Sequence, residues 1–203
     1  MAISEDIEQV INELGPLVVV YDHNTQTSNE EHIDYNRDVR ATTPFDSSFF
    51  IECDLPYNST AKPGDKITFQ ATNENYLLAT LDTEIFEASV VVKEGVLYKC
   101  NTTIEVQEKS GERNSDYVME TVWNPVFSGE HALFTGTLSE QNINDERYAR
   151  IYSKTRSLFA SIDLPIEQEH RCLVNGEAYR VDLVEPDRLP GLKICSLSLD
   201  NRE

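Results

Sequence analysis

The chain has 203 residues, of which 36 are acidic and 17 are basic, and its net charge is −19 at pH 7. This length suits one large domain or two small ones. The acidic surplus argues against a surface that grips nucleic acid, because phosphate binding relies on clustered Lys and Arg side chains. Hydrophobic residues make up 39% of the sequence, which is enough for packed cores and argues against wholesale disorder.

The first 16 residues predict a short amphipathic helix. Apolar side chains recur there at helical spacing, and Gly15-Pro16 ends the pattern. The apolar face covers the first β-module or docks into a neighbouring subunit, in which case Ile7 and Ile11 are candidate subunit contacts. The segment lacks the basic region and apolar core of a signal peptide, and no apolar run approaches a membrane span. We therefore expect a protein that is not secreted and has no membrane partner.

Residues 17–110 predict a first β-module. A β-type apolar run at 17–21 is followed by a polar arm at 22–48 without helix or strand period, which is either disordered or ordered on assembly. Turn residues at 62–65 (Lys-Pro-Gly-Asp) and 93–95 (Lys-Glu-Gly) separate the strands that follow. These strands are expected at 49–53, 66–71, 76–81, 87–93 and 96–106.

Residues 107–116 are expected to be a linker, and 117–203 a second β-module. Asn175-Gly176 predicts a hairpin, because this pair readily adopts two positive φ angles. Regular short strands with turn residues between them indicate small barrels or sandwiches. The strands are expected at 117–123, 131–136, 148–155, 158–162, 170–174, 178–184 and 193–199.

Two stretches are nearly the same at an offset of 81 residues. Residues 77–85 (LLATLDTEI) match 158–166 (LFASIDLPI), and 95–99 (GVLYK) then fall on 176–180 (GEAYR) without a gap. We interpret the match as an internal duplication. The predicted fold is mainly β, with two tandem small barrel or SH3-like modules and a short N-terminal helix.

The reactive side chains do not form a recognisable metal, cofactor or nucleophile motif. The cysteines have no CxxC spacing, and the duplication places Cys100 opposite Val181, as expected for small buried apolar groups. His170 and Cys172 could place two ligands on one strand face, and Glu167 lies three residues before His170, but a metal site needs three or four converging ligands. We expect no metal, no cofactor and no catalytic residue.

Asp82 and Asp163 are carboxylates that the repeat preserves. Two such acids could perform general acid–base chemistry if the modules faced one another. Each follows a strand, however, where Asp more often caps a turn through its own backbone, and we favour that role.

Basic and aromatic side chains offer further candidate subunit contacts. The pairs Tyr98-Lys99 and Tyr179-Arg180 recur, either as an edge patch for a partner or as an inward aromatic beside an outward charge. Basic charge also gathers at 147–156, where it could help copies pack head to tail against the more acidic first half, or simply form a solvated strand face. The basic residues concerned are Arg147, Arg150, Lys154 and Arg156.

Residues 172–184 and 189–199 resemble the barrel ending of tailed-bacteriophage neck proteins, the head-closure (stopper) and head–tail joining group. Residues 62–67 (KPGDKI) resemble the turn that opens a barrel strand in the same group. The resemblance implies a structural virion protein without enzymatic activity, assembled in the host cytoplasm. It implies a homo-oligomeric ring, hexameric or dodecameric, that joins portal or adaptor proteins to tail proteins while DNA passes without specific binding.

Two alternatives stand beside this interpretation. Single-barrel stoppers have about half this length, and tandem barrels also occur in phage baseplate or tail-hub proteins. The alternative of another class is a cytoplasmic β-module that binds a carbohydrate or peptide ligand, or a small hydrolase that uses Asp82 and Asp163.

Overall fold

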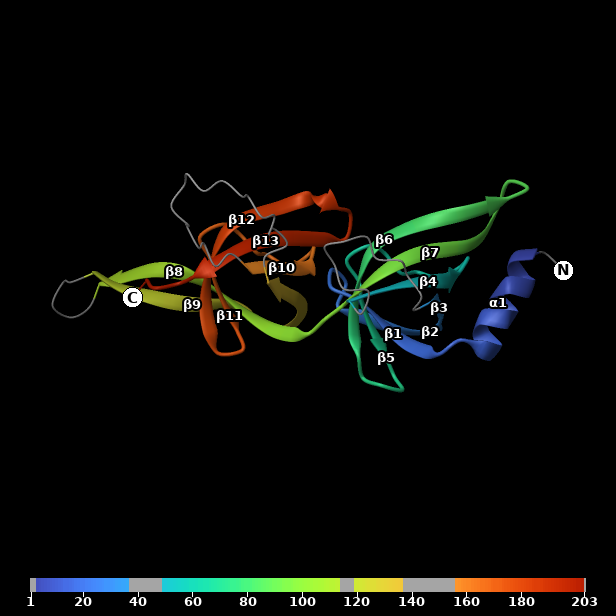
Figure 1. Cartoon of the computed structure of the whole chain (residues 1–203), viewed down its shortest axis with the longest axis horizontal. Coiled ribbons are helices and arrows are strands. Elements are labelled where there is room, and N and C mark those ends of the chain that lie inside the picture. Colours follow the sequence, from blue (N-terminus) through green and yellow to red (C-terminus); the bar gives the residue numbers. More distant parts are fainter. Residues whose placement is uncertain (1–2, 37–48, 114–118, 137–155, 203) are drawn as a thin grey trace, which may run out of the picture. The chain divides into compact units, whose positions relative to one another are not determined.

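A computed structural model describes residues 3–36, 49–113, 119–136 and 156–202 (Figure 1). The described chain is mainly β with one short N-terminal helix, which confirms the predicted fold class. It divides into two compact units. Unit 1 comprises Met1–Cys100, Ala160–Leu164 and Pro186–Lys193, and unit 2 comprises Asn101–Phe159, Pro165–Glu185 and Ile194–Glu203. The division differs from a simple boundary near residue 110, because two short C-terminal segments belong to the first unit.

Unit 1 begins with α1 (Ile3–Leu14), which ends where Gly15-Pro16 predicts. Seven strands follow in a sheet of order β2-β1-β5-β6-β7-β4-β3, in which neighbours run antiparallel. Their bounds are β1 (Leu17–Asp22), β2 (Thr27–His32), β3 (Asp34–Asn36), β4 (Phe50–Pro56), β5 (Lys66–Phe69), β6 (Asn75–Phe86) and β7 (Ser89–Lys99). Among the described residues, no helix is long and apolar enough to cross a membrane.

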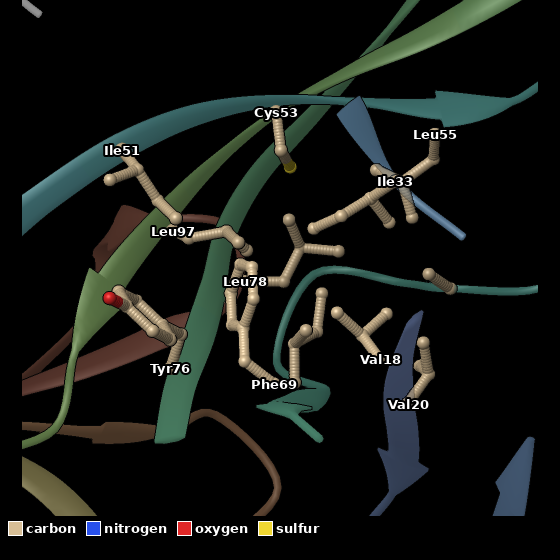
Figure 2. Packing of buried hydrophobic residues seen from close by; sticks show 12 residues of the cluster. Val18, Val20, Ile33, Ile51, Cys53, Leu55, Phe69, Tyr76, Leu78 and Leu97 are labelled. Atoms are coloured by element: carbon tan, nitrogen blue, oxygen red, sulfur yellow. The ribbon is translucent and has the colours of Figure 1, made fainter. Parts of the chain in front are cut away.

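One face of this sheet encloses the core of unit 1 (Figure 2). Alternate residues point inward as the period of a strand requires, so that Val18 of β1 and Leu55 of β4 join one buried cluster with Leu78 of β6. Because β1 and β4 lie near opposite edges of the sheet, the sheet must curl around these side chains. The residues between these positions, such as Asp54 and Asp82, point to the opposite face and are exposed.

The sequence expectations for the polar arm and for one turn of unit 1 are wrong. The arm at 22–48 contains β2 and β3, whose polar side chains hide the strand pattern; residues 37–48 lie outside the described part. The turn expected at 93–95 lies within β7, and the hairpin closes instead at Glu87-Ala88, both with positive φ. Gly95 serves packing: a Cβ there would lie 2.9 Å from Leu78 Cδ1.

The turn expected at 62–65 is confirmed, and it anchors the two C-terminal segments of unit 1. Gly64 adopts a φ of 103° and donates its N–H to the Leu78 carbonyl over 2.7 Å. Gly191 donates to the neighbouring carbonyl of Ala79 over 2.9 Å. A Cβ on Gly191 would lie 2.3 Å from the Leu78 oxygen, so only glycine allows this close backbone approach.

Unit 2 is built on a closed barrel of strand order β10-β13-β12-β11-β8-β9. Asn175-Gly176 forms the predicted hairpin, with φ angles of 51° and 83°. Fully buried side chains such as Phe159 and Leu197 fill the interior. The strands are β8 (Thr102–Arg113), β9 (Met119–Gly136), β10 (Arg156–Ser161), β11 (Arg171–Val174), β12 (Glu177–Leu189) and β13 (Leu192–Leu199).

The predicted linker at 107–116 is wrong, because β8 continues to Arg113 and pairs with β9. The strands expected at 117–123 and 131–136 are one strand, β9. The strand expected at 148–155 lies outside the described residues.

The repeated sequence does not repeat the strand order. In unit 1, the repeat lies on the adjacent strands β6 and β7, where Leu77 pairs with Tyr98. In the barrel, the matching residues lie on β10 and β12, which are separated by β13. The similar residues therefore serve the same alternation of inward and outward side chains in two different arrangements.

Candidate binding face of the first unit

Four carboxylates lie directly opposite one another across four neighbouring strands of unit 1. Asp34 of β3 pairs with Asp54 of β4, which pairs with Glu94 of β7, which pairs with Asp82 of β6. Directly opposite residues share one face of a sheet, with Cβ atoms about 4.5–5.5 Å apart. We call these four residues the acidic row. All four are exposed, and they lie on the face that points away from the core.

The acidic row lowers the stability of the sheet. Like charges directly opposite each other repel, and no described Lys or Arg forms an ion pair with any of the four. Burial raises the pKa of Asp54, and the charges of Glu94 and Asp34 raise it further. The row is therefore a place where an added positive charge lowers the free energy.

A hollow of about 600 Å³ lies over the acidic row. Glu52 adds a fifth carboxylate to its lining, and Asn36 and Thr80 contribute polar groups. None of the described residues that line it is a Lys, Arg or His. We call this space the row hollow.

A second hollow of about 410 Å³ lies alongside α1, and we call it the helix groove. Asp34 and Asp54 line both spaces, so the row hollow and the helix groove form one continuous face. In Figure 1, α1 lies at the same end of unit 1 as the tip of the β6–β7 hairpin. The groove has apolar walls, Ile3, Ile7, Val10, Ile11 and Val92, and four carboxylates, Asp6, Asp34, Asp54 and Glu84.

A bulge in β6–β7 explains how α1 is held beside the row. The register shifts between Glu84 and Ile85, and Val91 and Val92 are both buried although they are consecutive. They form a small cluster with Ile11, which is 4% exposed, and with Ile7. Ile11 is thus used inside the chain, as the covering role of the helix predicts, and is not accessible as a subunit contact.

The two repeated acids do not meet in one site. Asp163 lies in a turn, as predicted, and its N–H donates to Ser161 Oγ over 3.4 Å; a capping role for its carboxylate stays a prediction. Asp82 lies within β6, so the turn role predicted for it is wrong. The row hollow that Asp82 lines contains no residue of the Asp163 turn.

Asp65, by contrast, is a structural acid of unit 1. It is 3% exposed, and its Oδ2 accepts the Lys62 N–H over 2.8 Å, which closes the Lys-Pro-Gly-Asp turn. Burial raises the pKa of Asp65 to about 6, although the hydrogen bond from Lys62 opposes the shift.

In unit 2, two arginines hold a buried carboxylate, that of Asp200. The Asp200 side chain is fully buried and accepts hydrogen bonds from Arg171 Nε over 2.9 Å and Arg202 Nε over 2.8 Å. Both guanidinium groups lie over the Trp123 ring, at 3.9 and 5.0 Å. Burial alone would raise the pKa of Asp200, but the hydrogen bonds from Arg202 and Arg171 outweigh it and hold the pKa well below its usual range.

The paired aromatic and basic side chains have partners within the chain. Tyr98 packs edge-on against Phe50 at 4.5 Å, and Lys99 forms an ion pair with Glu74. On β7, as the strand period requires, the two residues point to opposite faces.

Tyr179 is buried and donates its hydroxyl proton to Glu177 over 2.5 Å, while Arg180 pairs with Asp182 over 2.7 Å. Arg156 begins β10 and is half-buried. The other basic candidates, Arg147, Arg150 and Lys154, lie outside the described residues, so all of these subunit contacts stay predictions.

Three of the four free cysteines, Cys53, Cys172 and Cys195, are buried, as expected for small apolar groups. Burial raises the pKa of Cys53 and Cys172 to about 12. In the part of the chain that the structure describes, no three His, Cys, Asp or Glu side chains are placed to hold a metal ion. His170 instead accepts the Glu167 N–H at Nδ1 over 3.2 Å.

The acidic row was not identified from the sequence. Its members lie at positions 34, 54, 82 and 94, and only the strand register brings them together. In the sequence, Asp34 and Asp54 each lie between apolar residues, which indicates the outward side of a strand, but Glu94 lies between Lys93 and Gly95 and offers no such pattern.

No protein-family model matches the chain, and no curated protein matches it. Matching solved structures are of MrkH, described as a c-di-GMP-dependent transcription regulatory factor, including the apo state of the K. pneumonia protein. These two are 9% identical to the chain, cover 98% and 99% of it and 84% of MrkH, and have TM-scores of 0.24 and 0.25. Scores this low carry no argument about the fold or function of the chain.

The predicted membership of the bacteriophage neck group is wrong: no family model and no curated protein of that group matches the chain, and none of the comparisons shows a relationship to it. The role as a virion protein, in a neck or in a baseplate, is wrong with it. The residues that suggested it have local explanations. A glycine is needed at position 64 because the backbone there lies close to β6. The alternation of buried Tyr179 and more exposed Arg180 occurs in any strand with one buried face.

Proposed function

We propose that this chain is a non-catalytic protein-binding module. Its outer face on unit 1, made of the row hollow and the helix groove, binds a segment of a partner that carries both basic and apolar side chains. The observation that supports the proposal is the acidic row, a line of carboxylates that no described Lys or Arg neutralises, beside an apolar groove that Asp34 and Asp54 also line.

The chemistry of the face favours a peptide over other ligands. Its carboxylates repel phosphate groups, which argues against nucleic acids and nucleotides. The row crosses four strands, a span of about 14 Å at roughly 4.8 Å per strand, which matches several residues of an extended chain. Apolar walls in the groove add burial that a small cation cannot use.

The arrangement also predicts how binding depends on salt. The row is exposed, so its attraction to basic side chains is screened by ions. The apolar contacts of the groove are not screened in this way. Affinity should therefore fall as salt rises, without vanishing when the row is fully screened.

The test uses a short fluorescent peptide that alternates lysine and tyrosine, titrated with the full chain and followed by anisotropy. We expect saturable binding at low salt that weakens as salt rises, and no binding of the matched glutamate–tyrosine peptide. Asp54→Asn with Glu94→Gln should weaken binding by about tenfold, the equivalent of 1.4 kcal/mol.

The control is Glu108→Gln, which removes an exposed carboxylate from β8 in unit 2 and should leave binding unchanged. Equal affinity of the row variant and the wild type would contradict the proposal. So would equal binding of the two peptides.

A further inference from the structure

The helix groove has apolar surface that the chain does not use for its own packing. A helix that only covers a sheet needs one apolar stripe, and α1 buries Ile11 and part of Ile7 in that way. Ile3 and Val10 line the groove but are 49% and 55% exposed. They form, with Ile7, a second stripe at helical spacing that faces the open groove.

The groove selects its occupant by charge as well as by apolarity. Its rim carries four carboxylates, and no described residue that lines it is basic. An occupant must therefore place cations at the rim and apolar side chains between the walls. Buried carboxylates without such cations would carry a desolvation cost.

One segment of this same sequence has that composition. Residues 147–156 read RYARIYSKTR and contain four of the 17 basic residues of the chain, without any acid. Tyr148, Ile151 and Tyr152 supply large apolar groups between the cations. The rest of the chain carries 36 acids, so no net positive stretch of comparable density competes for the groove.

We infer that the helix groove and acidic row of one copy bind residues 147–156 of a second copy. This inference rests on the proposed function and names its partner. Each copy has one groove and one basic segment, so the contact joins two different surfaces. Such a contact repeats from copy to copy, and the assembly grows into a ring if the rotation between copies closes or into an open filament if it does not.

This geometry gives a mixing test with two full-length variants. Val10→Glu places a like charge in the groove but leaves the basic segment intact. The second variant, Arg147→Glu with Arg150→Glu and Lys154→Glu, reverses the segment but leaves the groove intact. Leu14→Glu is the matched control, because Leu14 is 81% exposed on the same helix and does not line the groove.

We expect sedimentation velocity at low salt to show wild type and Leu14→Glu as larger assemblies and each of the two variants alone as a monomer. An equimolar mixture of the two variants should form a dimer and nothing larger, because only one competent contact remains. Circular dichroism and thermal melts must show both variants folded. A mixture that stays monomeric, or variants that assemble like the wild type, would overturn the inference.

A labelled peptide of residues 147–156 separates this inference from the proposed function. The segment variant should bind it, and Val10→Glu should bind it at least about tenfold more weakly. Binding of the lysine–tyrosine peptide with no binding of this one would overturn the inference and leave the proposed function standing. Failure of both peptides would overturn both.

A monomeric wild type that binds the labelled peptide only after its own segment is reversed would show that the segment fills the groove of its own chain. That outcome would also overturn the second copy as occupant.

Discussion

The two units differ in whether their carboxylates are paired with cations. Asp200 of unit 2 is fully buried, and Arg171 and Arg202 both donate to it. The acidic row of unit 1 is exposed, and no described cation pairs with it. One arrangement neutralises a charge inside the fold, whereas the other leaves charge concentrated on an open face.

The contrast separates acids that hold the fold from acids that are available to a partner. An acid that stabilises its own chain has its partners built in, as Asp200 has. Four acids that repel one another across a sheet reduce its stability, and the binding role that we propose gives a reason for keeping them. Asp65 lies between these cases, because it is buried in a turn of unit 1 but its hydrogen bond comes from a backbone N–H rather than from a cation.

Asp200→Ala should have the largest effect. Removing the carboxylate leaves the Arg171 guanidinium without its buried partner, and breaking a buried pair in this way costs about 3–5 kcal/mol. Urea unfolding of the full chain measures the change. The control is Asp182→Ala, which removes a partly exposed pair with Arg180 and should cost no more than about 1 kcal/mol. Similar losses in both variants would contradict the distinction.

Asp200 also makes the free energy of unfolding depend on pH in the acid range. The folded-state pKa of Asp200 is held below its unfolded value, so its contribution is present above about pH 4 and is lost as pH falls through the folded pKa. Unfolding free energies measured between neutral pH and pH 2 should fall less steeply in Asp200→Ala than in the wild type. An unchanged acid slope would assign the lost stability to other groups.

Asp65→Asn should stabilise unit 1 at neutral pH. The pKa of Asp65 is raised from 3.8 to about 6, so the folded state binds more protons than the unfolded state between these values. Stability from this group therefore falls as pH rises from about 4 to 6. The amide can still accept the Lys62 N–H without being charged, so the gain at pH 7 should reach up to about 3 kcal/mol.

Thermal melts of wild type and Asp65→Asn at pH 4.5 and pH 7 check this sign. The two proteins should converge at the lower pH and separate at the higher one. A variant that is less stable at pH 7 would show that the ionised carboxylate strengthens the turn.

Asp54→Asn with Glu94→Gln should have the smallest effect on folding. These groups are exposed, and relief of repulsion between them is worth about 0.2–1 kcal/mol, in the stabilising direction. High salt should abolish the difference, because it screens the same repulsion in the wild type. A loss of stability at low salt would mean that the row takes part in holding the sheet.

The sequence predicted those parts of the fold that depend on local chemistry. Asn175-Gly176 turns where expected because that pair tolerates positive φ, and α1 ends at Gly15-Pro16. The hairpin at Glu87-Ala88 was missed because neither residue favours the positive φ it adopts. The charged and polar side chains at the end of β8 resemble those of a linker. This segment is a strand because its backbone pairs with β9, and the side chains do not reveal that pairing.

The candidate site was less accessible from sequence than the fold. Four acids in an acidic protein carry no signal until the register of β3, β4, β7 and β6 aligns them. The neck-protein resemblance drew on turn and strand patterns that many β proteins share. What the sequence did show was uneven charge, with bases gathered at 147–156, and this observation is the one that the proposed interface uses.

The most direct test of the central claim measures folding and binding in one variant. Asp34→Asn, Asp54→Asn, Asp82→Asn and Glu94→Gln together remove the charge of the acidic row and keep its shape. We predict that this variant unfolds at the same or a higher urea concentration than the wild type at low salt, and that it loses most of its affinity for the lysine–tyrosine peptide. A variant that binds the peptide as tightly as the wild type, or that loses affinity only because it is less stable, would contradict it.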